Sequence, residues 1–227
     1  MQSIAQTTID PPAQALVEEF ANTLTHGVGL VLSLTGAAAM MLVVGAADLG
    51  LTIGCGVYAA TLVAVYALST LSHAVQRPRA RHLLRVWDQG VIYLLIAGSY
   101  TPFVSAFLSA HLRSATLSVI WTLALIGFFS KVVNRHRVNA IATHSYVLLG
   151  WVPALALVGF VPLGCLAWIV VGGLTYTLGT LFLLMDNRFR FFHATWHMLV
   201  VAASASHYYA IITYVVLQDA SPPATVP

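Results

Sequence analysis

Charged residues are scarce in this chain of 227 residues. Asp, Glu, Lys and Arg together make up 7% of it, against roughly 25% in an ordinary soluble domain, whereas 59% of the residues are hydrophobic. This composition excludes a soluble globular protein, and it equally excludes a disordered chain, which needs few apolar residues and many charges. The only two cysteines, Cys55 and Cys165, lie in apolar runs, so a disulfide scaffold is excluded as well.

Long apolar runs take the place of the missing charge. A helix of about 20 apolar residues crosses the roughly 30 Å hydrocarbon core of a bilayer, and we count seven such runs. Because they lack the alternating pattern of a membrane β-barrel, we expect an all-α integral membrane bundle of seven transmembrane helices. The runs are Leu24–Ala46, Leu51–Ser72, Trp87–Leu108, Ala115–Val132, Ala140–Val158, Leu163–Met185 and His193–Leu217.

These runs use most of the chain and leave no room for a separate soluble domain. We expect a cytoplasmic segment over residues 1–23, the transmembrane domain over 24–217 and a short external tail over 218–227. The first run is not predicted to be a cleaved signal peptide, because it is too long and no Lys or Arg precedes it. Asp10-Pro11-Pro12 predicts a helix start, with Ala13–Phe20 as a short surface helix.

The basic residues predict the orientation of the bundle. Nine of the ten Lys and Arg residues follow the second, fourth and sixth runs, and Arg113 alone lies on the other side. Positively charged loops stay in the cytoplasm, so we expect the N-terminus inside, the C-terminus outside and a multi-pass protein of the plasma (inner) membrane. The basic loops are thus topological signals, which argues against a nucleic-acid partner and leaves membrane lipids as the surroundings.

A few ionisable side chains fall at the ends of the apolar runs. Placing such a group inside a bilayer costs free energy, so each of them is a candidate for a functional role. His73, Asp88, His193 and His197 are all predicted at one depth, just below the cytoplasmic surface. Ser69 lies one turn before His73, and the H-x-x-x-H spacing stacks the last two imidazoles on one helix face.

Three histidines at one level match the ligand number of a catalytic zinc site, which keeps a fourth position open for water. Asp88 is then predicted to orient or deprotonate that water, and Ser69 to hold the water or the substrate oxygen. Haem held by one histidine from each of two helices is a competing ligand, but it leaves the third histidine and Asp88 without a role.

Other histidines have more ordinary interpretations. His207 falls on a similar side of the last run, about 15 Å further along the helix, and we expect a buried ring bonded to a neighbouring carbonyl. His26 clusters with Glu18 and Glu19 at the entrance of the first run, where pairing with the basic loops is expected. His144 remains an additional candidate for the metal.

These motifs resemble the hemolysin III group of the progestin and adipoQ receptor family, which includes the adiponectin receptors. The resemblance implies a seven-helix fold with a zinc ion near the cytoplasmic face, His73, His193 and His197 as its ligands, and Asp88 and Ser69 around the bound water. The matching segments are Glu18–Gly27, Ser69-x-x-x-His73, Asp88, Ile96–Phe103 and His193-Ala194-Thr195-Trp196-His197 with His207 ten residues later.

Two classes of function follow from this resemblance. Members similar to the adiponectin receptors are linked to ceramide hydrolysis, which implies a zinc-dependent hydrolase acting on a lipid amide or ester. The bacterial branch was named for haemolysis, which implies a pore-forming protein. A receptor-like sensor with a structural zinc is a further non-enzymatic alternative.

Overall fold

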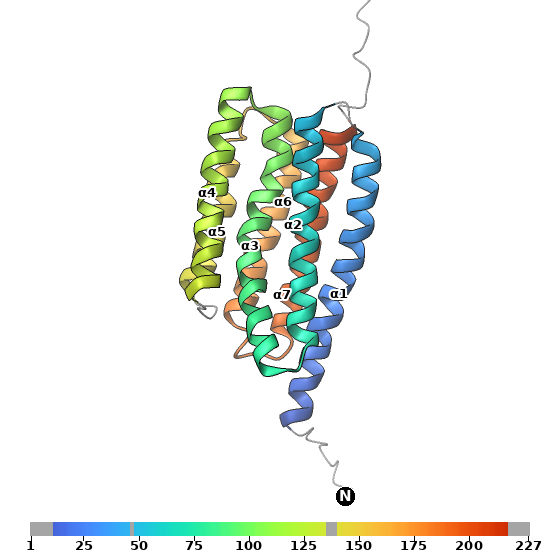
Figure 1. Cartoon of the computed structure of the whole chain (residues 1–227), viewed down its shortest axis with the longest axis vertical. Helices are drawn as coiled ribbons and strands as arrows, with labels where there is room; N and C mark the ends of the chain where they lie inside the picture. The colour runs from blue at the N-terminus through green and yellow to red at the C-terminus, as the bar shows by residue number, and fades with distance from the viewer. Residues whose placement is uncertain (1–10, 46–47, 135–139, 218–227) are drawn as a thin grey trace, which may run out of the picture.

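Within residues 11–45, 48–134 and 140–217, which the structure describes, seven α-helices lie side by side in one bundle (Figure 1). This computed structural model confirms the all-α prediction. A π-helical segment, η1 (Ile212–Val216), directly continues the last helix. The helices are α1 (Pro11–Val44), α2 (Leu49–Ala74), α3 (Pro78–Phe107), α4 (Ala110–Asn134), α5 (Ala140–Leu155), α6 (Leu163–Leu184) and α7 (Phe192–Ile211).

Six of these helices are long and apolar enough to cross a membrane, so the described chain is that of a multi-pass membrane protein. The exception is α5, which has 16 residues, fewer than the roughly 20 that a crossing needs. Its predicted run extends to Val158, but the helix ends two residues after Pro153, and Gly159 then takes a left-handed φ of 85°. The seventh crossing therefore stays a prediction.

Two helices begin differently from the sequence prediction. The surface helix expected over Ala13–Phe20 is no separate element, because α1 runs unbroken from Pro11 to Val44 over 34 residues. By helix rise it is about 51 Å long, so one end reaches beyond a 30 Å hydrocarbon core. α3 begins at Pro78, nine residues before the predicted Trp87, because proline is well suited to the first helical position. Of the four arginines expected in a loop there, Arg79, Arg81 and Arg85 are consequently helical, and Arg77 is the N-cap.

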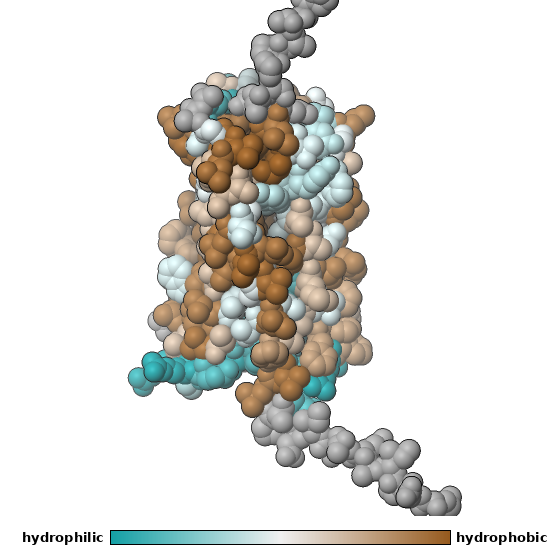
Figure 2. Space-filling model, turned by 90° about the vertical axis from the view of Figure 1, so that its right-hand side faces the viewer, coloured by the Kyte–Doolittle hydropathy of each residue, from teal (hydrophilic) through white to brown (hydrophobic). Residues whose placement is uncertain are grey.

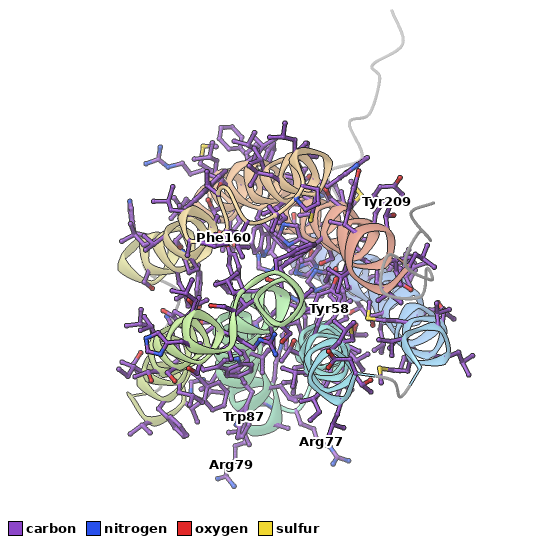
Figure 3. The ribbon with its side chains drawn as sticks, turned by 90° about the horizontal axis from the view of Figure 1, so that it is seen from above. Tyr58, Arg77, Arg79, Trp87, Phe160 and Tyr209 are labelled. Carbon is purple, nitrogen blue, oxygen red and sulfur yellow. The ribbon has the colours of Figure 1, made fainter. Side chains whose placement is uncertain are left out.

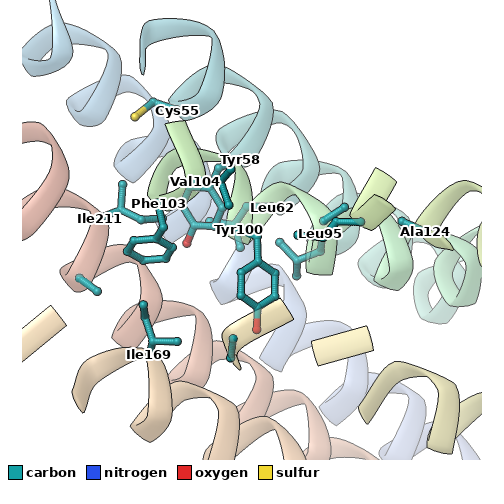
Figure 4. Close-up of a cluster of buried hydrophobic side chains, with 14 of the residues drawn as sticks. Cys55, Tyr58, Leu62, Leu95, Tyr100, Phe103, Val104, Ala124, Ile169 and Ile211 are labelled. Atoms are coloured by element: carbon teal, nitrogen blue, oxygen red, sulfur yellow. The ribbon is translucent and has the colours of Figure 1, made fainter. Parts of the chain in front are cut away.

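The core of the bundle is built from aromatic and aliphatic side chains of all seven helices. Figure 4 shows Tyr58, Phe103 and Ile169 within this cluster. Helix packing in membranes depends on small residues where backbones approach, and Gly172 of α6 is such a position. A Cβ atom there would collide with the ring of His207 on α7 and lie 3.2 Å from the Ala203 carbonyl oxygen.

The outer surface is divided along the bundle axis. Apolar side chains cover much of the face in Figure 2, and the most hydrophilic residues form a band at the lower end, where α1 begins. Among the described basic residues, Arg113 alone lies at the opposite end, where α4 begins. Arg77 and Arg79 point away from the bundle (Figure 3). Part of the sequence lies outside the described residues, including Asp10, Arg135, Arg137 and the predicted tail over 218–227.

Candidate metal centre

The structure brings the three histidines predicted as metal ligands together. His73 stands in the last turn of α2, while His193 and His197 occupy the first two turns of α7. One ligand atom from each ring lies within 4.8 Å of the other two, and the ring centroids are 4.6 to 5.1 Å apart. We call these three residues the histidine triad; its geometry allows a single metal ion to contact all three rings.

Carboxylates fix two of the three imidazole rings. His73 Nδ1 lies 2.7 Å from Glu19 Oε2, and His193 Nδ1 lies 2.9 Å from Asp186 Oδ2. When Nδ1 carries the proton and donates to such an acceptor, the lone pair on Nε2 is free for a metal. The contacts therefore favour the tautomer that a metal ligand requires.

The third ring has the same arrangement with neutral acceptors. His197 Nδ1 lies 3.2 Å from both Thr25 Oγ1 and the Asn22 carbonyl oxygen. The Thr25 hydroxyl donates its own hydrogen to the Ala21 or Asn22 carbonyl, so towards His197 it acts as an acceptor. All three rings thus use Nδ1 for a protein oxygen, and this donor set fits a divalent metal ion bound through Nε2.

Glu19 connects the triad to the start of α3. Its Oε1 atom forms ion pairs with Arg81 and with Arg85, the latter at 2.9 Å, while Oε2 accepts from His73. The pairing of the acidic residues of α1 with basic segments is confirmed, and Glu18 likewise pairs with Arg190 at 3.3 Å. Through Glu19, α1 holds a ligand of α2 in place.

Asp88 lies in the same region as the triad but contacts serines. Its Oδ2 atom accepts a hydrogen bond of 3.0 Å from Ser72, and the Ser69 side chain lies beside the same carboxyl group. Ser69 and Ser72 are both almost fully buried. The structure therefore brings predicted Asp88 and Ser69 together and adds Ser72, one residue from His73, as a direct partner.

His26 lies against the triad in a way that the sequence did not predict. Its ring stacks on that of His197 with centroids 3.5 Å apart and planes 17° from parallel. The spacing of Glu19, Asn22 and His26 places all three on one face of α1, and this pattern was the available signal that the first helix contributes to the site.

The other histidines lie outside the triad. His207 Nε2 donates to the Ile169 carbonyl oxygen at 3.2 Å, which confirms the predicted bond to a backbone carbonyl. His144 has an exposed side chain and is not a member of the triad. The haem alternative does not fit, because triad rings about 5 Å apart leave no space for a macrocycle between them.

A cavity of about 1140 Å³ surrounds the triad at the end of the bundle where α1 and α7 begin. Asp88, Ser69 and His26 line it together with the three histidines. A smaller, almost wholly apolar pocket of about 100 Å³ lies between α3, α5, α6 and α7. The two share five lining residues, namely Val65, Ile92, Tyr146, Trp196 and Val200.

Fold and site together define a class: a multi-pass α-helical membrane protein with a histidine cluster that can hold a metal ion near one end of the bundle. Comparison with known proteins is more specific. The chain belongs to the family described as Haemolysin-III related, whose family model matches residues 14–208. The resemblance predicted from the motifs is thereby confirmed.

Curated relatives match over nearly their whole length. The chain is 34% identical to Hemolysin-3 of Bacillus cereus over 211 residues, which cover 89% of this chain and 94% of the relative. It is 31% identical to the Hemolysin-3 homolog of Bacillus subtilis, covering 88% and 95%. It is also 30% identical to the human Monocyte to macrophage differentiation factor over 202 residues, covering 87% and 84%, in agreement with the predicted wider relationship.

Proposed function

We propose that this protein is a zinc-dependent membrane hydrolase that cleaves a lipid amide or ester, with His73, His193 and His197 as the metal ligands. One observation carries the proposal: three imidazoles converge, and each has an oxygen acceptor at Nδ1. Imidazole ligands suit zinc, and three protein ligands are typical of catalytic zinc, whereas structural zinc usually has four.

The chemistry divides between the metal and the residues around it. Bound zinc polarises a substrate carbonyl and lowers the pKa of water to about 7. Asp88 accepts the proton of the attacking water at Oδ1, since Oδ2 already accepts from Ser72, and later delivers it to the leaving amine or alcohol. Ser69, buried beside this carboxyl group, holds the water or the carbonyl oxygen by a hydrogen bond.

The two neighbouring cavities support a lipid as the substrate. The larger one combines the triad with polar groups and accommodates a polar head and water, and the smaller one is apolar and suits part of an acyl chain. Outward-facing leucines lie close in sequence to the triad or its hydrogen-bond partners, such as Leu24 of α1 at 54% and Leu71 of α2 at 47% exposure. A molecule that reaches this site from the bilayer is itself a membrane lipid.

We also propose a topology for the bundle. The end that carries the triad faces the cytoplasm, with the N-terminus inside, the C-terminus outside and α5 as the seventh crossing of the plasma membrane. Arg81, Arg85 and Arg190 pair with Glu19 and Glu18 at that end, and these arginines support this orientation. Water for hydrolysis then enters from the cytoplasm.

The test is turnover of lipid amides and esters by the purified, zinc-loaded protein. We expect Asp88→Asn to lower turnover by about 10² to 10⁴ while the zinc content stays at the wild-type level. Asp48→Asn is the matched control: this residue caps α2 at the opposite end of the bundle, where Asn caps equally well. No turnover across a broad lipid panel, or equal losses in both variants, contradicts the proposal.

Membrane lysis is the second candidate, because two of the bacterial relatives are named hemolysins. A pore-forming function predicts ion conductance in pure lipid bilayers that does not depend on Asp88. A conducting wild-type chain without lipid turnover favours this candidate over the hydrolase.

A further inference from the structure

His26 is a fourth imidazole beside the triad, and the reaction proposed above does not use it. Its side chain is 3% exposed and packs face to face on His197 and edge-on against Tyr66, with a centroid distance of 5.2 Å to the latter. In the part of the chain that the structure describes, the group able to hold one metal ion consists of His73, His193 and His197 and omits His26.

The ring nitrogens of His26 set it apart from the triad. Both Nδ1 and Nε2 are buried, and neither has a hydrogen-bond partner among the described residues. A neutral imidazole offers one donor and one acceptor, and burying them unsatisfied is unfavourable, so each such case calls for an explanation. Since His26 lines the cavity around the triad, a molecule inside that cavity can supply the missing partners.

The charges of the cavity indicate which head group fits. Four carboxylates line the cavity against two guanidinium groups, and both guanidinium groups pair with Glu19. This excess of negative charge disfavours a phosphate, although Arg81 Nε has no hydrogen-bond partner among the described residues. A hydroxyl or amide group is uncharged and can bond to a neutral imidazole. The charged lining residues are Glu18, Glu19, Asp88, Asp186, Arg81 and Arg85.

We propose that His26 is a substrate-binding residue that hydrogen-bonds the hydroxyl or amide head of an uncharged lipid, and that phosphorylated lipids are excluded. This assignment rests on the proposed hydrolase function and names its substrate class. The stacking on His197 holds the His26 ring next to the metal ligands, so the head group is bound beside the centre that cleaves it.

Binding is measured separately from turnover, in zinc-supplemented full-length protein that carries Asp88→Asn. The probe is a fluorescent short-chain ceramide, its binding is followed by fluorescence anisotropy in detergent, and its 1-phosphate ester is the comparison ligand. His26→Phe keeps an aromatic ring over His197 but removes both nitrogens, whereas His26→Gln keeps hydrogen-bonding groups. His111→Phe, at an exposed histidine of α4 far from the triad, is the matched control.

We expect His26→Phe to weaken ceramide binding about tenfold, the factor that corresponds to one lost hydrogen bond, with unchanged zinc content. His26→Gln loses less affinity, His111→Phe loses none, and the phosphate ester binds at least tenfold more weakly than ceramide. Three results overturn the assignment: His26→Phe binds as its parent does, it loses zinc together with lipid, or the phosphate ester binds equally well. A chain that binds ceramide through His26 but cleaves nothing instead refutes the hydrolase.

Discussion

Metal affinity at the histidine triad is expected to depend on Glu19, which is not a member of the triad but contacts His73. Its two carboxylate oxygens serve different partners: Oε2 accepts from His73 Nδ1 at 2.7 Å, and Oε1 faces Arg81 and Arg85. Glu19→Gln keeps the shape of the side chain but leaves one acceptor. If the amide oxygen turns to His73, the amide nitrogen points its hydrogens at two guanidinium groups; if it turns to the arginines, His73 loses its acceptor.

Either arrangement weakens the hold on the His73 ring, and loss of a carboxylate partner of this kind costs about 10- to 100-fold in metal affinity. This factor corresponds to roughly 1.4 to 2.8 kcal/mol. The free energy of unfolding is also expected to fall: the Arg85 side chain is 46% exposed and its pair contributes at most about 1 kcal/mol, whereas Arg81, at 23% exposure, loses a less exposed partner.

The assay is competition for zinc between the detergent-solubilised protein and a chromogenic chelator. Glu18→Gln is the control, since this neighbouring carboxylate pairs with Arg190 at 3.3 Å in an exposed position and contacts no triad ring. We expect the control to bind zinc within twofold of wild type. Wild-type affinity in Glu19→Gln, or an equal loss in both variants, contradicts this role of Glu19.

Two further predictions concern other contacts. Asp186→Asn should lower zinc affinity by a smaller factor than Glu19→Gln does. The His193 side chain is 30% exposed against 6% for His73, so water replaces part of the lost contact. The same chelator assay measures this difference. Gly172→Ala should destabilise the protein by about 1 to 3 kcal/mol through overpacking, seen as a lower melting temperature, whereas Gly150→Ala, with open space at its Cβ, should not.

The sequence predicted the triad because its members obey local rules. His193 and His197 are one helical turn apart, and His73 and Asp88 fall at the ends of long apolar runs that alternate in direction through the bilayer. Depth in a membrane follows from position along a helix, so groups near equivalent ends meet at one level. The depth of each group is therefore predictable without knowledge of how the helices pack.

The supporting residues could not be found in this way. Asp186 lies between two helices, where a carboxylate is normally assumed to be hydrated, and its contact with His193 depends on how the chain turns between α6 and α7. The stacking of His26 on His197 depends on the rotation of α1 about its own axis. The early start of α3 was missed because its first turns carry three arginines and no apolar run.

The ligands of the triad come from opposite halves of the chain, since His73 ends the second helix and the other two begin the last. During synthesis only one of the three imidazoles, that of His73, is present outside the ribosome until α7 emerges. An ion held by all three can therefore bind only after translation of the bundle is essentially finished. Such an ion would link a helix that is synthesised early to the helix that is synthesised last.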